Sequence, residues 1–109
     1  MRLNNIVIAA HDYESMRDFY KALTDWPVFF ENDKCCFLGR GKPYVVVHRV
    51  GPETEVNAPT STMCLDFEVI DLDAEVVRLQ QFGLAPVMKG EMATLRDPAN
   101  NLIELVPSE

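Results

Sequence analysis

The chain has 109 residues, a length that suits one compact domain rather than two. Hydrophobic residues make up 48% of it, which excludes a disordered chain, and with a net charge of −7 and no basic cluster it offers no surface for nucleic acid. The longest apolar run near the start, residues 6–10, is too short for a membrane span or a signal sequence, so we expect a cytoplasmic protein.

The first half of the chain has the pattern of one strand, one helix and three further strands. Residues 3–10 form an apolar run that predicts a strand covered on both faces. Asp12 can cap the next helix, which must end before Pro27. Its apolar stripe has helical spacing: Met16, Phe19, Tyr20 and Leu23. Strands are predicted at residues 28–31, 34–38 and 44–50.

A polar stretch at residues 51–61, with prolines at 52 and 59, predicts a linker, after which the same pattern starts again. A strand at residues 63–69 leads to Asp71, a second capping residue, and Gly83 can close the helix that follows. The apolar face of this helix is predicted from Leu72, Val76, Leu79 and Phe82. The last three strands are predicted at residues 85–89, 92–96 and 102–106.

The order is therefore β-α-β-β-β in each half, which is an internal repeat of one supersecondary unit. The two halves match best where residues 5–12 align with residues 64–71, since both runs end at a capping aspartate. This pattern predicts an α+β fold built of two modules, residues 1–50 and 62–109.

Cysteines and aromatic residues are expected mainly in the interior. Cys35 and Cys36 are adjacent and would point to opposite faces of a strand, and with Cys64 they form no C-x-x-C motif, so we expect all three to be reduced and at least partly buried. Five aromatic residues are predicted to be mostly core: Trp26, Phe29, Phe30, Phe37 and Tyr44. Trp26, next to a helix end, is the best candidate among them for a pocket wall.

The end of the chain carries the most informative stretch. Asp97-Pro98 opens a turn, and Asn100 and Asn101 tolerate the left-handed backbone that closes it. The strand that follows places Glu104 among apolar neighbours, where a charge needs a partner, a wet cavity or a ligand. Two interpretations of Glu104 remain: it is a ligand-binding carboxylate, or it is a structural carboxylate paired with Arg49 or Arg96.

Three motifs in this order resemble the vicinal-oxygen-chelate superfamily, which includes glyoxalase I, extradiol dioxygenases and bleomycin-resistance proteins. They are Asp12 followed by residues 16–20 (Met-Arg-Asp-Phe-Tyr), residues 67–69 (Phe-Glu-Val) leading to residues 71–73, and the run from Asp97 to Glu104, with Asn100 where the family usually has glycine. The resemblance implies one domain, residues 1–109, whose tandem βαβββ modules curl a mixed sheet into a cup with the helices on its outer face. It also implies a homodimer, because short chains of this kind complete their module edges with a second subunit.

Metal enzymes of this superfamily place ligands on the first and last strands of each module. By this resemblance the first-strand positions are occupied by Asn5 and Cys64, and the last-strand position of the second module by Glu104. In the last strand of the first module, residues 44–50, His48 is the only possible ligand. Because an amide and a buried thiol are poor ligands for a hard divalent metal, we expect no metal and no cofactor.

The resulting hypothesis is a metal-free small-molecule-binding protein, closest to the bleomycin-resistance branch, that holds its ligand in the cup or in a groove between subunits. The alternative is a metal-dependent lyase, isomerase or dioxygenase with altered metal ligands. Asp66 and Glu68 share the face of Cys64, where they line the cup or meet water. The expected ligand has a flat apolar part and a positive charge. The candidate ligand-binding residues are Glu104, Asp66, Glu68, Cys64, Asn5, His48 and Trp26.

Overall fold

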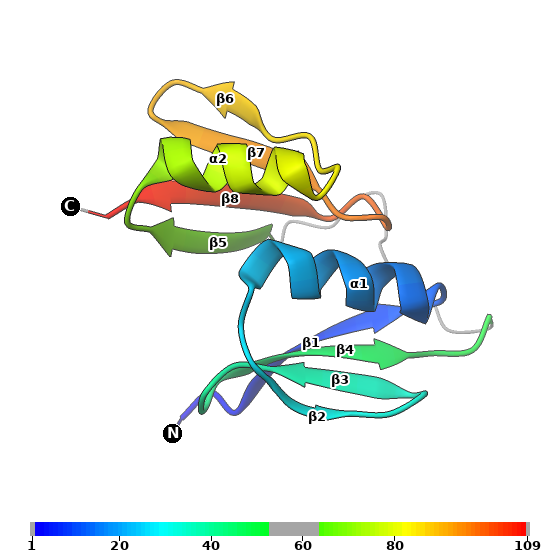
Figure 1. Cartoon of the computed structure of the whole chain (residues 1–109). Helices are drawn as coiled ribbons and strands as arrows, with labels where there is room; N and C mark the ends of the chain where they lie inside the picture. The colour runs from blue at the N-terminus through cyan, green and yellow to red at the C-terminus, as the bar shows by residue number, and fades with distance from the viewer. Residues whose placement is uncertain (1, 53–63, 109) are drawn as a thin grey trace. The chain divides into compact units, whose positions relative to one another are not determined.

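The computed structural model describes residues 2–52 and 64–108, and its contacts divide into two compact units, residues 1–58 and 59–109 (Figure 1). In the described ranges each unit holds one helix and one four-stranded mixed sheet, so the α+β class and the tandem βαβββ order are confirmed. The single domain and the cup remain predictions. Most of the predicted linker, residues 53–61, and the first residue of the strand predicted at 63–69 lie outside the described residues.

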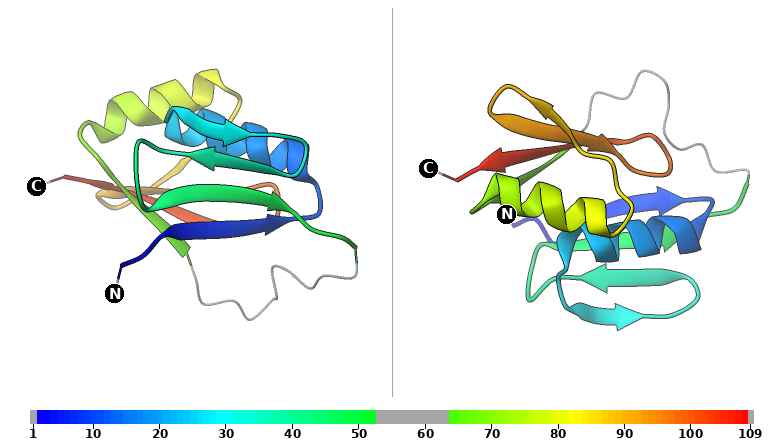
Figure 2. Two further views of the ribbon diagram at one scale, coloured as in Figure 1. Left: turned by 90° about the horizontal axis from the view of Figure 1, so that it is seen from below. Right: turned by 45° about the horizontal axis from the view of Figure 1, so that its top comes forward.

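The first module has the sheet order β1-β4-β3-β2, with β1 parallel to β4 and the other pairs antiparallel (Figures 1 and 2). Its elements are β1 (Asn5–Ala10), α1 (Tyr13–Thr24), β2 (Val28–Glu31), β3 (Cys35–Leu38) and β4 (Tyr44–Arg49). The helix α1 covers one sheet face, and the strand residues that point toward it are buried: Ile8, Ala10, Cys36, Leu38, Val45 and Val47. Burying each large apolar side chain of this kind contributes roughly 1.5–3 kcal/mol.

The second module repeats this topology with the sheet order β5-β8-β7-β6. Its elements are β5 (Cys64–Val69), α2 (Leu72–Gln81), β6 (Val87–Lys89), β7 (Met92–Arg96) and β8 (Leu102–Pro107). The helix α2 contacts β7 and β8, and its core residue Leu79 is fully buried with Ile103.

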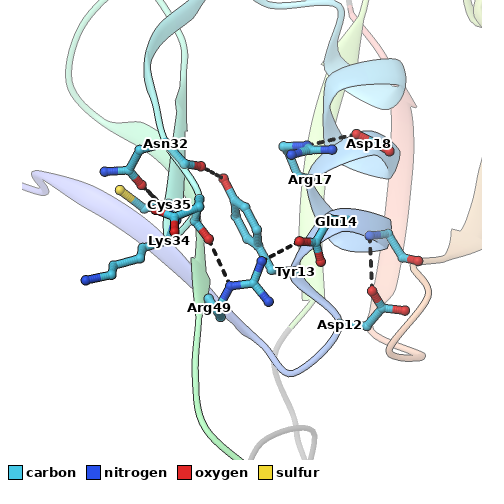
Figure 3. Close-up of polar contacts among 11 residues, drawn as sticks. Asp12, Tyr13, Glu14, Arg17, Asp18, Asn32, Lys34, Cys35 and Arg49 are labelled. Atoms are coloured by element: carbon cyan, nitrogen blue, oxygen red, sulfur yellow. Dashed lines mark hydrogen bonds and ion pairs between the residues drawn. The ribbon is translucent and has the colours of Figure 1, made fainter.

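The side chain of Tyr13 joins α1 to the sheet of the first module (Figure 3). Tyr13 is completely buried, and its hydroxyl donates a 2.9 Å hydrogen bond to the backbone oxygen of Asn32. The guanidinium groups of Arg17 and Arg49 lie 5.5 and 4.9 Å from the centre of its ring, and Arg49 also pairs with Glu14. Burial, with a smaller contribution from Cys36, raises the pKa of Tyr13 to about 12. This tyrosine is therefore a neutral structural contact at physiological pH.

Both capping aspartates act as predicted. Asp12 accepts a hydrogen bond from the backbone of Ser15, and Asp71 accepts one from Ala74. The end of α1 differs from the prediction in its cause, because Asp25 already closes the helix in the left-handed region (φ 52°), two residues before Pro27. Gly83, with φ 81°, ends the second helix region as expected.

Several burial predictions were wrong. Phe82 follows the last turn of α2 as its C-cap and is exposed under the guanidinium of Arg78, so it is not on the apolar face of the helix. Val7 is exposed, so β1 is covered on one face only.

In the described residues, no helix is long and apolar enough to cross a membrane.

Candidate functional site

Each module has an open face, which is the face of its sheet that points away from the helix. On the open face of the first module four rings touch one another, and we call them the aromatic cluster: Phe29, Phe30, Phe37 and Tyr44. Phe29 stacks on Tyr44 with 4.8 Å between ring centres, and Phe37 contacts Tyr44 and Phe30 edge to face. Phe29 is 64% exposed and Phe30 is 50% exposed, which corrects their prediction as core residues. The irregular register between β2 and β3 turns both side chains to this face, and the sequence carries no signal for it.

The same open face carries the first module's two other candidates. Asn5 lies opposite Tyr44, and its side-chain oxygen is buried without a hydrogen-bond partner among the described residues. His48 is exposed and lies opposite Ala9 and Cys35. Asn5 and His48 are separated by four residues along the paired strands, roughly 13 Å at the rise of a β-strand, so they cannot serve one small ligand atom together.

The open face of the second module is acidic. Glu104 on β8 lies between Asp66 on β5 and Thr94 on β7, and Glu68 follows Asp66 on the same face. Like charges directly opposite each other destabilise a sheet, so the pairing of Asp66 with Glu104 favours a cation at this face. Glu104 is half-buried, whereas Asp66 and Glu68 are exposed.

Cys64 reaches Glu104 diagonally across the ladder. Its Sγ donates a hydrogen bond to Oε1 of Glu104 at 3.6 Å, and no ion pair of Glu104 occurs in the described residues. The arginines suggested as its partners contact other groups: Arg49 pairs with Glu14, and Arg96 donates to the backbone oxygen of Asn100. Loss of hydration at the sulfur, followed by the nearby charge of Glu104, raises the pKa of Cys64, so the thiol stays protonated at neutral pH. Cys64 is exposed, which corrects the prediction that it is partly buried; Cys35 is half-buried and Cys36 buried, as predicted.

A turn held by a buried carboxylate precedes the strand of Glu104. Asp97 is only 4% exposed and accepts hydrogen bonds from the backbone of Ala99 (2.9 Å) and Asn101 (2.8 Å) and from the side chain of Asn101 (2.7 Å). Asn100 adopts a φ of 70°, as its prediction required. The motif from Asp97 to Asn101 is therefore structural, and it fixes where the strand that carries Glu104 begins.

The strand register decides how the superfamily's metal-ligand positions map onto this chain. The parallel pairs β1–β4 and β5–β8 are equivalent, with Asn5 opposite Tyr44 just as Cys64 is opposite Leu102. Glu104 lies two residues beyond Leu102, so its counterpart in the first module is Val46, and His48, the only possible ligand in this strand, lies two residues further on.

The residues at these positions do not fit a hard divalent metal. Val46 has no ligand atom and Asn5 offers a neutral amide, which leaves Cys64 and Glu104, whose side chains are in contact, as the possible ligands. Across residues 2–52 and 64–108, no group of three or more His, Cys, Asp and Glu side chains is arranged to hold a metal.

Trp26 lies in the segment between α1 and β2. It is 40% exposed and forms one wall of an open depression of about 490 Å³ whose other walls come from the β3–β4 turn, residues 39–43. The position of Trp26 as a pocket wall agrees with its prediction, although it is not a core residue. We call this depression the turn pocket.

Solved structures show the same fold over the full chain. A glyoxalase/bleomycin resistance protein/dioxygenase family enzyme from Burkholderia phytofirmans aligns with a TM-score of 0.73 and 18% identity, covering 98% of each chain. A bleomycin resistance determinant encoded on the transposon Tn5 aligns with a TM-score of 0.69 and 20% identity, covering 100% of this chain and 99% of that one. A lactoylglutathione lyase from Agrobacterium tumefaciens gives 0.67 and 14%, with 97% and 92% covered. The search of curated proteins finds no significant match.

The family is decided by the sequence model for the glyoxalase-like domain, which matches residues 5–106 and so spans both modules and both open faces. With the tandem βαβββ topology and these structural neighbours, the match confirms the resemblance found in the sequence motifs. The chain belongs to the glyoxalase-like domain family of the vicinal-oxygen-chelate superfamily.

Proposed function

We propose that this protein binds a small molecule through the open faces of its sheets and that it does so without a metal. The observation that carries the proposal is the aromatic cluster, four touching rings on a face that the helix of the module does not cover, with Phe29 and Phe30 exposed. Exposed apolar patches of this kind mark binding sites, and stacked rings favour a flat apolar partner.

The charge preference comes from the second module. Glu104 is half-buried among apolar strand residues, and Asp66 lies directly opposite it, so a positive group would relieve their repulsion. A unit charge pair at contact is worth roughly 4 kcal/mol at an effective dielectric constant of 20, before desolvation is subtracted. We therefore infer that the open face of the second module binds a positive group and that the open face of the first module binds a planar apolar group.

A thermal-shift titration with benzamidine, a planar cation, tests this function, with uncharged benzamide as the matched compound. Benzamidine should raise the melting temperature, and the gain should shrink at high salt, because the charge pair is partly accessible to solvent. Glu104→Gln should remove most of the gain, and Phe29→Ala should reduce it. Glu91→Gln and Phe82→Ala change exposed residues of the same types away from the open faces, and they should leave it unchanged.

Two results would contradict the proposal. Equal stabilisation by benzamide would remove the role of charge. An undiminished benzamidine effect in Glu104→Gln would make that carboxylate structural.

A second candidate function is a metal-dependent lyase, isomerase or dioxygenase with altered ligands, because the 3.6 Å contact of Cys64 and Glu104 brings two metal-binding side chains together. Zinc accepts both side-chain types. Elemental analysis after dialysis separates the candidates: stoichiometric nickel, zinc or manganese in the dialysed protein would favour this second function, and our proposal expects none.

We also propose that the protein is a cytoplasmic homodimer. Support comes from edge strands that carry exposed apolar side chains, among them Val7 on β1 and Val87 and Met88 on β6. Such edges pair readily with another chain. Light scattering at micromolar concentration should give twice the mass of the 12.4 kDa chain, and a monomer would contradict the proposal.

A further inference from the structure

The turn pocket of the first module has a composition unlike the rest of this acidic chain. Its lining consists of Trp26, Gly39, Arg40, Gly41, Lys42 and Pro43, without a single acidic residue. Four other basic side chains are in ion pairs with carboxylates: Arg17, Lys21, Arg49 and Arg78. Arg40 and Lys42, by contrast, are exposed and form no ion pair within the described residues. Two cationic residues and one partly exposed tryptophan thus line the same depression.

The backbone explains why these groups meet. The N–H of Gly39 donates a 2.9 Å hydrogen bond to the oxygen of Pro27, which holds the turn against the segment that follows Trp26. Gly39 has a φ of 134°, a conformation that residues with a side chain rarely adopt, and a Cβ there would lie 3.3 Å from Tyr44. The glycine therefore lets the turn approach closely, and Arg40 and Lys42 line the same depression as Trp26.

We propose that the turn pocket binds a small aromatic anion, a planar ring that carries a carboxylate or a phosphate. The ring stacks on Trp26, and the anionic group is held by the guanidinium of Arg40 and the ammonium of Lys42. The depression of about 490 Å³ has the size of an ordinary small-molecule site. Its ligand has the opposite charge to the one inferred for the open face of the second module.

Trp26 is the only tryptophan of the chain, so its indole N–H gives a single cross-peak in a ¹H–¹⁵N NMR spectrum. Titrations with benzoate and with phenyl phosphate should move this cross-peak until it saturates. Benzyl alcohol and benzamidine, which share the ring but lack the negative charge, should move it far less. Inorganic phosphate alone tests the contribution of the ring, and should bind more weakly than phenyl phosphate.

The variant Arg40→Gln/Lys42→Gln should weaken benzoate binding by roughly fivefold or more, as expected for two exposed charge pairs. Lys89→Gln removes a cation of the second module that likewise lies outside the ion pairs of the described residues, and it should not change the affinity. Glu104→Gln should have no effect either, so this test is independent of the proposed open-face function. Overlap of the variant and wild-type spectra elsewhere shows that the fold is kept.

The proposal is overturned if neither anion gives a saturable shift of the indole cross-peak up to ~20 mM, a concentration far above the dissociation constants of specific sites. It is also overturned if benzyl alcohol binds as well as benzoate, or if the double variant binds benzoate like the wild type. If phenyl phosphate binds and benzoate does not, the site selects phosphate; the reverse result assigns it to carboxylates.

Discussion

Replacement of Asp97 should destabilise the fold more than any exposed acidic residue, because its buried carboxylate accepts three hydrogen bonds within one turn. Asp97→Ala leaves the two backbone N–H groups of Ala99 and Asn101 without this acceptor. Hydrogen bonds to charged groups contribute roughly 1.5–3 kcal/mol each and are not additive, so we expect a loss of about 3–5 kcal/mol in the free energy of unfolding. At ~4–8 °C per kcal/mol, the melting temperature should fall by more than ~12 °C.

Asp97→Asn makes the prediction sharper. The amide oxygen can still accept from the two backbone N–H groups, but the charged 2.7 Å hydrogen bond with the side chain of Asn101 is lost, and rotation of the Asn101 amide replaces it only with a neutral one. This variant should lose about 1–1.5 kcal/mol, the difference between a charged and a neutral hydrogen bond. Urea unfolding monitored by circular dichroism measures both losses, with Asp33→Asn as the exposed control. Equal losses in the two variants would refute the reasoning. So would a loss below ~0.5 kcal/mol in Asp97→Ala, because that is the usual effect of a surface substitution.

Two further predictions concern groups whose pKa values the fold raises. Tyr13 keeps its proton up to a pKa of about 12 in the folded chain but loses it near 10 when unfolded, so stability should fall between pH 10 and 12. Tyr13→Phe should remove this part of the pH dependence, and urea unfolding at pH 9, 10 and 11 checks it; an unchanged slope would count against the assignment. Glu104 contributes to the raised pKa of Cys64, so in a Cys35→Ser background Glu104→Gln should shift iodoacetamide alkylation of Cys64 to lower pH. An alkylation profile that does not move would show that the carboxylate exerts no such effect.

Local patterns in the sequence were enough to predict the elements of this protein. The helical stripe from Met16 to Leu23 and the capping aspartates at 12 and 71 act within one or two helical turns, so they can be read without the fold. The strand ends moved by at most two residues, as with β1, predicted from Leu3 and observed from Asn5. The repeat itself could be recognised because the hydrophobic patterns typical of strands and helices follow in the same order in both halves.

The site was predicted only in part, because sequence spacing does not determine how strands align. Asp66, Glu68 and Cys64 were correctly assigned to one face of their strand, since alternation along a strand fixes the face of each side chain. The alignment of β4 with β1 depends on hydrogen bonds between residues almost forty positions apart, and it makes Val46, rather than the possible ligand His48, the counterpart of Glu104. Amide and carbonyl groups look the same at every position of a strand, so this register is decided when the module packs.

The exposure of the aromatic residues was likewise decided by tertiary structure. A phenylalanine in a strand belongs to the core if a helix covers its face, and α1 covers only the face of Cys36 and Leu38. Phe29 and Phe30 therefore remain open although their hydrophobicity predicted burial. The turn pocket has the same origin: Trp26 and Arg40 are fourteen positions apart in the chain, and the hydrogen bond from Gly39 to Pro27 helps to bring both residues into the lining of one depression.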